Sequence, residues 1–146
     1  MKNIQFLLSR DLNKLKEELS AYDDETLIWK IDKNISNSAG NLCLHIIGNL
    51  NHFIGAVLGN TGYQRNREQE FSVKDMSRER LIGYTDFTIK MINDTLNQIP
   101  ESDYKKTYPQ KINDMELDIE SMMIYLTVHL SYHLGQINYH RRLITA

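Results

Sequence analysis

The sequence has 146 residues, of which 41% are hydrophobic and 25% are charged, and its formal net charge is −2. This length suits one domain with its own hydrophobic core, so we expect a single domain over residues 1–146 that folds without a disulfide or a structural metal. The balanced charge argues against a disordered chain and against a strongly basic surface for nucleic acid.

Apolar residues at helical spacing predict an all-α protein, and the first two helices come from the N-terminal part of the chain. The first is expected over about Asn3–Leu19. The second is expected to begin after the polar segment 34–38, where Ser36 or Ser38 can accept a hydrogen bond from a free amide, and to run to about Gly59.

Two further helices are expected in the second half of the chain. The third starts near Asp75 or Ser77 and runs to Gln98, before a proline that ends it. The fourth starts near Asp114 and continues to about Leu143. Acidic residues near its start and arginines near its end suit the dipole of this helix.

The connection between the second and third helices, roughly residues 60–76, is too long for a tight hairpin. It can let the third helix run parallel to the second, which predicts a four-helix bundle of up-down-down-up topology. A simple up-down-up-down bundle with a decorated loop is the alternative.

The N-terminus and the cysteine content favour a cytoplasmic protein. The N-terminal segment mixes charges with its apolar residues and has neither a continuous apolar core nor a cleavage site of a signal peptide. Cys43 is the only cysteine, which excludes an internal disulfide and a cysteine-based zinc site. We expect Cys43 to lie in the core, and any metal site to use imidazole and oxygen ligands.

Two long segments contain no charged residue: one between Lys33 and Arg65, the other between Glu120 and Arg141. All five histidines lie inside them. Because a surface helix ordinarily carries a charged face, we expect each of these helices to be buried nearly all round or to line a cavity. Asparagine, glutamine and histidine residues interrupt both segments, so neither is interpreted as a membrane span.

On the second helix one flank beside the core face is polar and carries His45, Asn49 and His52. A strip without side chains lies next to it and consists of Gly48, Gly55 and Gly59. Glycine costs about 1 kcal/mol inside a helix, so the strip indicates close approach by another backbone, a partner chain or a substrate, or packing within the bundle.

On the fourth helix His129 and His133 are four residues apart, which brings both imidazoles within reach of one ion. A third imidazole from a facing helix would leave an open coordination position for water or substrate. Residues seven apart lie about 10.5 Å apart along a helix, so His45 and His52 are not expected to share a metal. The same spacing separates His133 from His140, and we place His52 and His140 in hydrogen-bonding or interface roles.

The sequence resembles the DinB-like superfamily of metal-binding four-helix proteins, which includes the YfiT-like bacillithiol transferases and mycothiol-dependent enzymes. The resemblance is carried by Leu27–Lys30, by Ser38–Leu44 leading into His45, and by the closing segment His129–Gln136. The segment Gly48–Phe71 is similar to a separate branch of that superfamily rather than to its thiol transferases.

The resemblance implies an up-down-down-up bundle, a homodimer, and zinc or nickel held by one histidine of the second helix and the pair on the fourth. The matching positions are His45, His129 and His133. A bound ion of this kind makes a nucleophile of a water or a thiol, which suggests a hydrolase or a thiol S-transferase acting on a small molecule.

Two amides are candidate site residues beside the histidines. Asn49 follows His45 by one turn and can hydrogen-bond a bound water, and Gln136 can orient His133 or the water. Neither amide can act as a general base. A catalytic carboxylate would have to come from elsewhere, with Glu68 and Glu70 of the long loop as candidates, although the simpler interpretation is that both are solvated.

The alternative function is a non-catalytic dimeric module that binds a metal or a small ligand. The Glu-x-x-His pairs of di-iron bundles and the His-Glu-x-x-His motif of metalloproteases are both absent. Arg65 and Arg67 can attract an anionic substrate or simply face solvent. Several aromatic residues can line a pocket or belong to the core or an interface: Trp29, Tyr63, Tyr84, Tyr132 and Tyr139.

Overall fold

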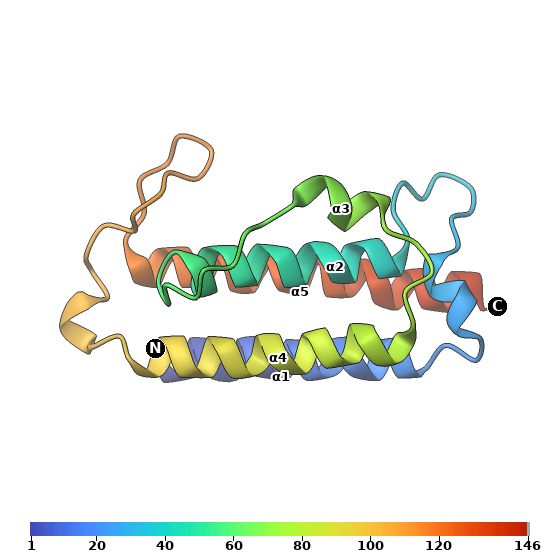
Figure 1. The fold of residues 1–146 in the computed structure, drawn as a ribbon, viewed down its shortest axis with the longest axis horizontal. Helices are drawn as coiled ribbons and strands as arrows, with labels where there is room; N and C mark the ends of the chain where they lie inside the picture. The colour runs from blue at the N-terminus through green and yellow to red at the C-terminus, as the bar shows by residue number, and fades with distance from the viewer. Residues whose placement is uncertain (146) are drawn as a thin grey trace.

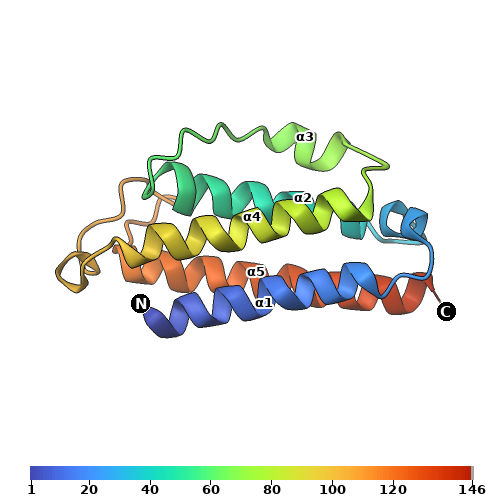
Figure 2. The ribbon, with the colours of Figure 1, turned by 60° about the horizontal axis from the view of Figure 1, so that its bottom comes forward.

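The computed structural model describes residues 1–145, and the prediction of an all-α protein is confirmed over these residues. Four long helices lie side by side in both ribbon views (Figures 1 and 2). They are α1 (Lys2–Ser20), α2 (Ala39–Leu50), α4 (Arg78–Asn97) and α5 (Ile119–Ile144). A short helix, α3 (Arg67–Ser72), lies over α2 within the long connection to α4.

The order of the helices in space follows from their contacts. α1 packs against α4 and α5, and α2 packs against the same two helices. In Figure 1, α1 and α5 run from left to right, whereas α2 and α4 run from right to left. Buried leucine, isoleucine and methionine side chains from all four helices form one hydrophobic cluster between them.

Side-chain caps fix where α2 and α4 begin. Ser38 accepts a hydrogen bond from the backbone amide of Asn41 at the start of α2. Ser77 does the same for the amide of Arg80 at the start of α4, so the predicted starts of both helices are confirmed. Each cap satisfies an amide that has no partner within the helix.

The predicted start of the last helix was wrong. α5 begins at Ile119, with Asp118 as its cap, and not near Asp114. Asn113 and Asp114 have φ values of 48° and 64°, and Ile112 forms a bridge with Met115. Asparagine and aspartate tolerate this left-handed conformation better than other residues with a side chain, so the segment turns back on itself before the helix starts.

The last part of the predicted second helix is π-helical and continues directly from α2. After α2 ends at Leu50, residues Asn51–Ala56 form a π-helical turn, and the turn of the chain at Gly59 agrees with the predicted end. The glycines of this segment face side chains of the same chain. A Cβ at Gly55 would lie 3.1 Å from the Met91 sulfur, and one at Gly59 would lie 2.5 Å from the Thr95 hydroxyl, both on α4.

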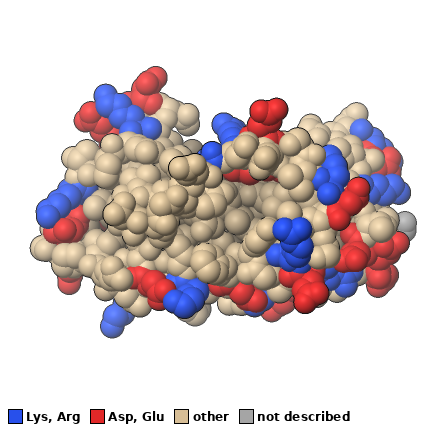
Figure 3. Space-filling model, in the orientation of Figure 1, with Lys and Arg blue, Asp and Glu red and all other residues tan. Residues whose placement is uncertain are grey.

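The two charge-free segments differ in their surroundings. All residues of α2 except Leu44 are buried, as predicted, and α3 covers part of its outer side. In Figure 3 most charged side chains lie around the margin of the visible face, and its centre is largely uncharged. For α5 the expectation was wrong, because one of its faces is exposed along its length. Within the described residues, none of the helices combines the length and hydropathy that crossing a membrane requires.

His140 belongs to the packing of the helix ends. Its Nε2 donates to the carbonyl of Lys30 at 2.8 Å, so its Nδ1 accepts the hydroxyl proton of buried Tyr22 at 2.6 Å. Both bonds require the neutral imidazole. Burial lowers the pKa of His140 below its usual value, although the bond to Lys30 opposes this. The prediction that His140 makes hydrogen bonds is thereby confirmed.

We therefore predict that His140 stabilises the fold above pH 6.5 and less so in acid. Below that pH the unfolded chain takes up a proton that the folded imidazole resists, so this contribution falls as the pH drops through the lowered pKa. His140→Phe leaves the Tyr22 hydroxyl unpaired, and we expect a loss of about 1–3 kcal/mol at pH 7.5 that shrinks towards pH 5. Urea unfolding of both metal-free proteins over this range measures it, and a difference that grows in acid contradicts it.

Candidate metal centre

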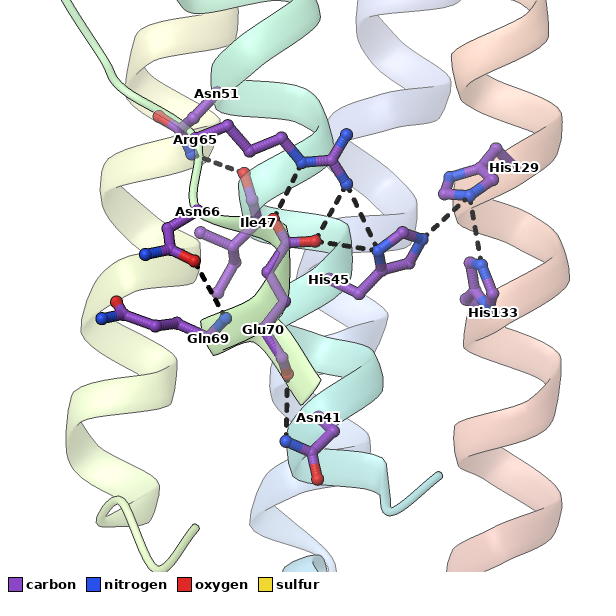
Figure 4. Close-up of polar contacts among 10 residues, drawn as sticks. All are labelled: Asn41, His45, Ile47, Asn51, Arg65, Asn66, Gln69, Glu70, His129 and His133. Carbon is purple, nitrogen blue, oxygen red and sulfur yellow. Dashed lines mark hydrogen bonds and ion pairs between the residues drawn. The ribbon is translucent and has the colours of Figure 1, made fainter. Parts of the chain in front are cut away.

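Three of the five histidines meet between α2 and α5. His45 comes from α2, and His129 and His133 come from successive turns of α5 (Figure 4). One ring nitrogen from each lies within 4.8 Å of the other two. The Nε2 atoms of His45 and His129 are 3.2 Å apart, and those of His129 and His133 are 3.1 Å apart. The structure thus brings the predicted metal ligands together.

The opposite sides of two of these rings are held by hydrogen bonds. Nδ1 of His45 lies 3.0 Å from Oε1 of Glu70, and Nδ1 of His133 lies 2.7 Å from Oε1 of Gln136. Because both partners are oxygen acceptors, each Nδ1 carries the proton and each Nε2 is left with a lone pair. These lone pairs point to the same small space between the helices.

The facing nitrogens fit a cation better than they fit one another. Nε2 of His129 contacts both other Nε2 atoms but carries at most one proton in a neutral ring. At least one of the two contacts therefore places two lone pairs against each other. A divalent ion between the three nitrogens removes this repulsion and supplies each lone pair with a partner. The donor set of three imidazoles is one that zinc and nickel accept.

Glu70 is the residue whose role the sequence did not reveal. Its side chain is buried, and its carboxylate forms a two-pronged pair with Arg65, with Nε to Oε2 at 2.8 Å and Nη2 to Oε1 at 2.9 Å. Burial raises the pKa of Glu70, but hydrogen bonds from Arg65 and His45 outweigh it and hold that pKa below its usual value. An ionised carboxylate only accepts, which requires His45 to donate from Nδ1.

The interpretation of Arg65 and Glu70 as solvated loop residues was therefore wrong, whereas Glu68 is exposed as expected. The error came from treating residues 60–76 as a loop. Asn66 caps α3 by accepting a hydrogen bond from the amide of Gln69, a spacing that marks the start of a helix. That signal is visible in the sequence, and it places Glu70 on the first turn and a half of a helix.

α3 is fastened to α2 at two places. The Asn41 side chain donates from Nδ2 to the carbonyls of Glu70 at 3.0 Å and Val73 at 2.8 Å. Further along α2, the Glu70 carboxylate occupies the space that Gly48 leaves free, since a Cβ there would lie 2.7 Å from Cδ of Glu70. Gly48 of the glycine strip is thus explained by packing within the chain. Phe71 adds an aromatic contact, with its ring centroid 5.1 Å from that of His45.

The imidazoles of α5 are kept neutral. Burial, followed by the neighbouring His133 and His45 and by the charges of Arg65 and Arg67, lowers the pKa of His129 to about 4. Burial also lowers the pKa of His133, against the hydrogen bond to Gln136. Neutral imidazoles bind metal without first releasing a proton, so the site is ready for an ion at neutral pH.

The two predicted amides both lie beside the histidines. Gln136 makes the predicted contact with His133, described above. Asn49 is 6% exposed and follows His45 by one turn of α2. Its Oδ1 is buried and has no hydrogen-bond partner within residues 1–145. Buried acceptors are normally paired, so this oxygen is an exception among the described residues.

The remaining candidates lie apart from the histidine group. His52 contacts Gln110 at 3.2 Å, and the fully buried Cys43 is a core residue, as expected. Trp29 is also buried and donates to the carbonyl of Met76 at 3.0 Å. Tyr132 is the exception, because its ring centroid lies 5.3 Å from that of His133.

Comparison with known families gives a match over nearly the whole chain. Residues 2–146 match a family model described as a protein of unknown function, DUF1572. The match includes all three histidines and Glu70. A comparison with curated proteins finds no match.

We predict that Gly48→Ala weakens metal binding more than it weakens the fold. The added methyl group would displace the Glu70 carboxylate, which can move only by breaking its bonds to Arg65 and His45. We expect a loss of about 1–3 kcal/mol in stability together with a lower zinc affinity, measured by urea unfolding and by calorimetric titration.

Gly83→Ala on α4 is the matched control, because a Cβ there meets no atom within 4 Å. It should leave zinc affinity unchanged and raise stability by up to about 1 kcal/mol. Equal zinc affinities for both variants would contradict the role given to Gly48.

Proposed function

The chain belongs to the DUF1572 family, and from its histidine site we propose that it is a metal-dependent enzyme that activates a water or a thiol. One observation carries the proposal: three Nε2 atoms converge from two helices, and two of the rings are held from behind by Glu70 and Gln136. Carboxylates and amides commonly orient metal-bound histidines in this way. Reactions of the hydrolase or thiol S-transferase type fit such a site.

We also assign the chain to the DinB-like superfamily and to its up-down-down-up bundles, with residues 1–146 as one domain. The helix directions in Figure 1 and the packing of α2 against both α4 and α5 support this assignment. So does the origin of the site, with one histidine on α2 and a pair four residues apart on α5.

Zinc or nickel is the ion we propose for the site. When bound, such an ion lowers the pKa of a water or a thiol and so provides a nucleophile at neutral pH. Imidazole ligands carry no negative charge, so His45, His129 and His133 would leave the ion's charge uncancelled, and the charge of Glu70 is already balanced by Arg65. Three protein ligands also leave room for a small-molecule substrate.

The chain's own residues divide the remaining tasks. Glu70 cannot serve as a general base, because Arg65 and His45 occupy both of its oxygens. Its task is to hold the ring of His45. The unpaired Oδ1 of Asn49 can accept a hydrogen bond from a water or substrate and so orient it, without removing its proton. The proton of the nucleophile must therefore leave to solvent or to the substrate.

We predict that the purified protein binds one zinc or nickel ion and that His129→Ala does not retain it. His129 contacts both other ligands, and its removal leaves two imidazoles. Metal analysis after dialysis, together with calorimetric titration, measures occupancy. His52→Ala is the control and should keep full occupancy, because His52 lies outside the group. Full occupancy in His129→Ala would refute the site.

Turnover separates the enzyme from a non-catalytic metal-binding module. The zinc- and nickel-loaded proteins are incubated with thiols plus electrophilic acceptors, and with ester and amide substrates. If the protein is an enzyme, we expect turnover that disappears when a chelator removes the metal and when His129 is replaced by alanine. Full metal occupancy without turnover on any of these classes would favour the binding module.

We further predict that Glu70→Gln lowers metal affinity about 10- to 100-fold, the range seen when the partner of a ligating histidine is replaced. Glutamine keeps the size of the side chain but loses the charge that strengthens the bond to His45. Glu68→Gln, on the exposed side of the same helix, is the matched control and should bind metal normally. Calorimetric titration of both variants gives the ratio of their metal dissociation constants, and a ratio near one would contradict the prediction.

A further inference from the structure

The exposed side of α5 is an apolar surface that the chain itself does not cover. We define the α5 outer face by residues that share this side of the helix: Ile124, Val128, Ser131, Tyr132, Gly135 and Tyr139. Its four large side chains are between 50% and 69% exposed. No charged residue lies between Glu120 and Arg141. A continuous apolar surface of this kind is unusual on a monomer and marks an interaction site.

The packing of the chain gives no reason for this composition. α5 uses other sides for its contacts with α1 and α2. Gly135 is a clear case, because a Cβ at this position would meet nothing within 4 Å. A glycine in a helix costs about 1 kcal/mol relative to alanine, and no neighbour within the described residues requires it. Close approach of a partner helix would require it.

We propose that the α5 outer face joins two copies of this chain, with their α5 helices antiparallel about a two-fold axis between Ser131 and Tyr132. The first support is the symmetry of the face about this point. Positions equally far from it pair Ile124 with Tyr139 and Val128 with Gly135. In an antiparallel pair, Ile124 of one copy faces Tyr139 of the other, and Val128 faces Gly135, so that a branched side chain packs against a glycine.

The second support is the charge at the two ends of the face. Glu120 stands in the first turn of α5, where it also pairs with Lys105, and Arg142 stands in the last turn beside Arg141, which already pairs with Glu18. An antiparallel pair brings Arg142 of one copy towards Glu120 of the other and also opposes the two helix dipoles. A parallel pair would bring like charges together at both ends.

The third support is the size of the surface. Two largely exposed tyrosines and the aliphatic side chains beside them offer on the order of 600 Å² per copy, close to the roughly 800 Å² of a standard interface before any rim is added. Tyr132 also contacts the ring of His133. The interface therefore reaches the edge of the histidine site, although it does not depend on the chemistry proposed there.

Sedimentation velocity of the full chain at about 10 to 100 µM tests the interface. The wild type should be a dimer and Val128→Glu a monomer. Phe87→Glu is the matched control, because Phe87 is a 70% exposed apolar residue on α4, and it should remain dimeric. Circular dichroism checks that each variant is folded. A monomeric wild type, or a dimer in folded Val128→Glu, would overturn the proposal.

Disulfide formation tests the orientation and does not depend on the glutamate variant. Ser131→Cys lies beside the proposed axis and should link to its own counterpart under mild oxidation. Ile124→Cys should not, since the two copies would lie about 20 Å apart along antiparallel helices. The buried Cys43 does not compete. Linking by Ile124→Cys would indicate a parallel pair, in which each residue of the face lies beside the same residue of the second copy, and would refute the antiparallel one.

Discussion

The buried carboxylate of Glu70 is the contact on which the site depends. It joins His45, the candidate metal ligand on α2, to Arg65 and, through α3, ties the long connection to the bundle. A buried charge is stable only when it is paired and hydrogen-bonded, and both of its oxygens are engaged here. The same contact fixes the ring of His45, so the packing of α3 against α2 also determines the geometry of the site.

Local signals in the sequence were enough to predict the four long helices and two of the candidate ligands. Periodicity and the caps at Ser38 and Ser77 place α2 and α4 within a few residues. His129 and His133 share a helix, so their spacing alone puts them together. The choice of His45 over His52 needed knowledge of the facing helix, which the family resemblance supplied and spacing did not.

The errors have a common physical cause. The cap at Asn66 signals a helix, but Glu70 acts on a histidine 25 residues away, and nothing local to residues 60–76 shows that this helix folds back over α2. The start of α5 was missed because Asn113 and Asp114 adopt left-handed conformations within a bridged turn, although their polar side chains are typical of a helix start. In both places contacts made by the folded chain, rather than propensity, decide the structure.

Two glycines show that a missing side chain can have different causes. Gly48 and Gly135 look alike in the sequence, since each interrupts a charge-free helix. In the structure, Gly48 admits a carboxylate and Gly135 faces open space. The lack of charged residues also has different causes on the two helices. On α2 it reflects burial within the chain. On α5 the core, the candidate metal ligands and the outer face each occupy one side of the helix. Burial within the chain explains two of those sides, and the proposed second copy would explain the third.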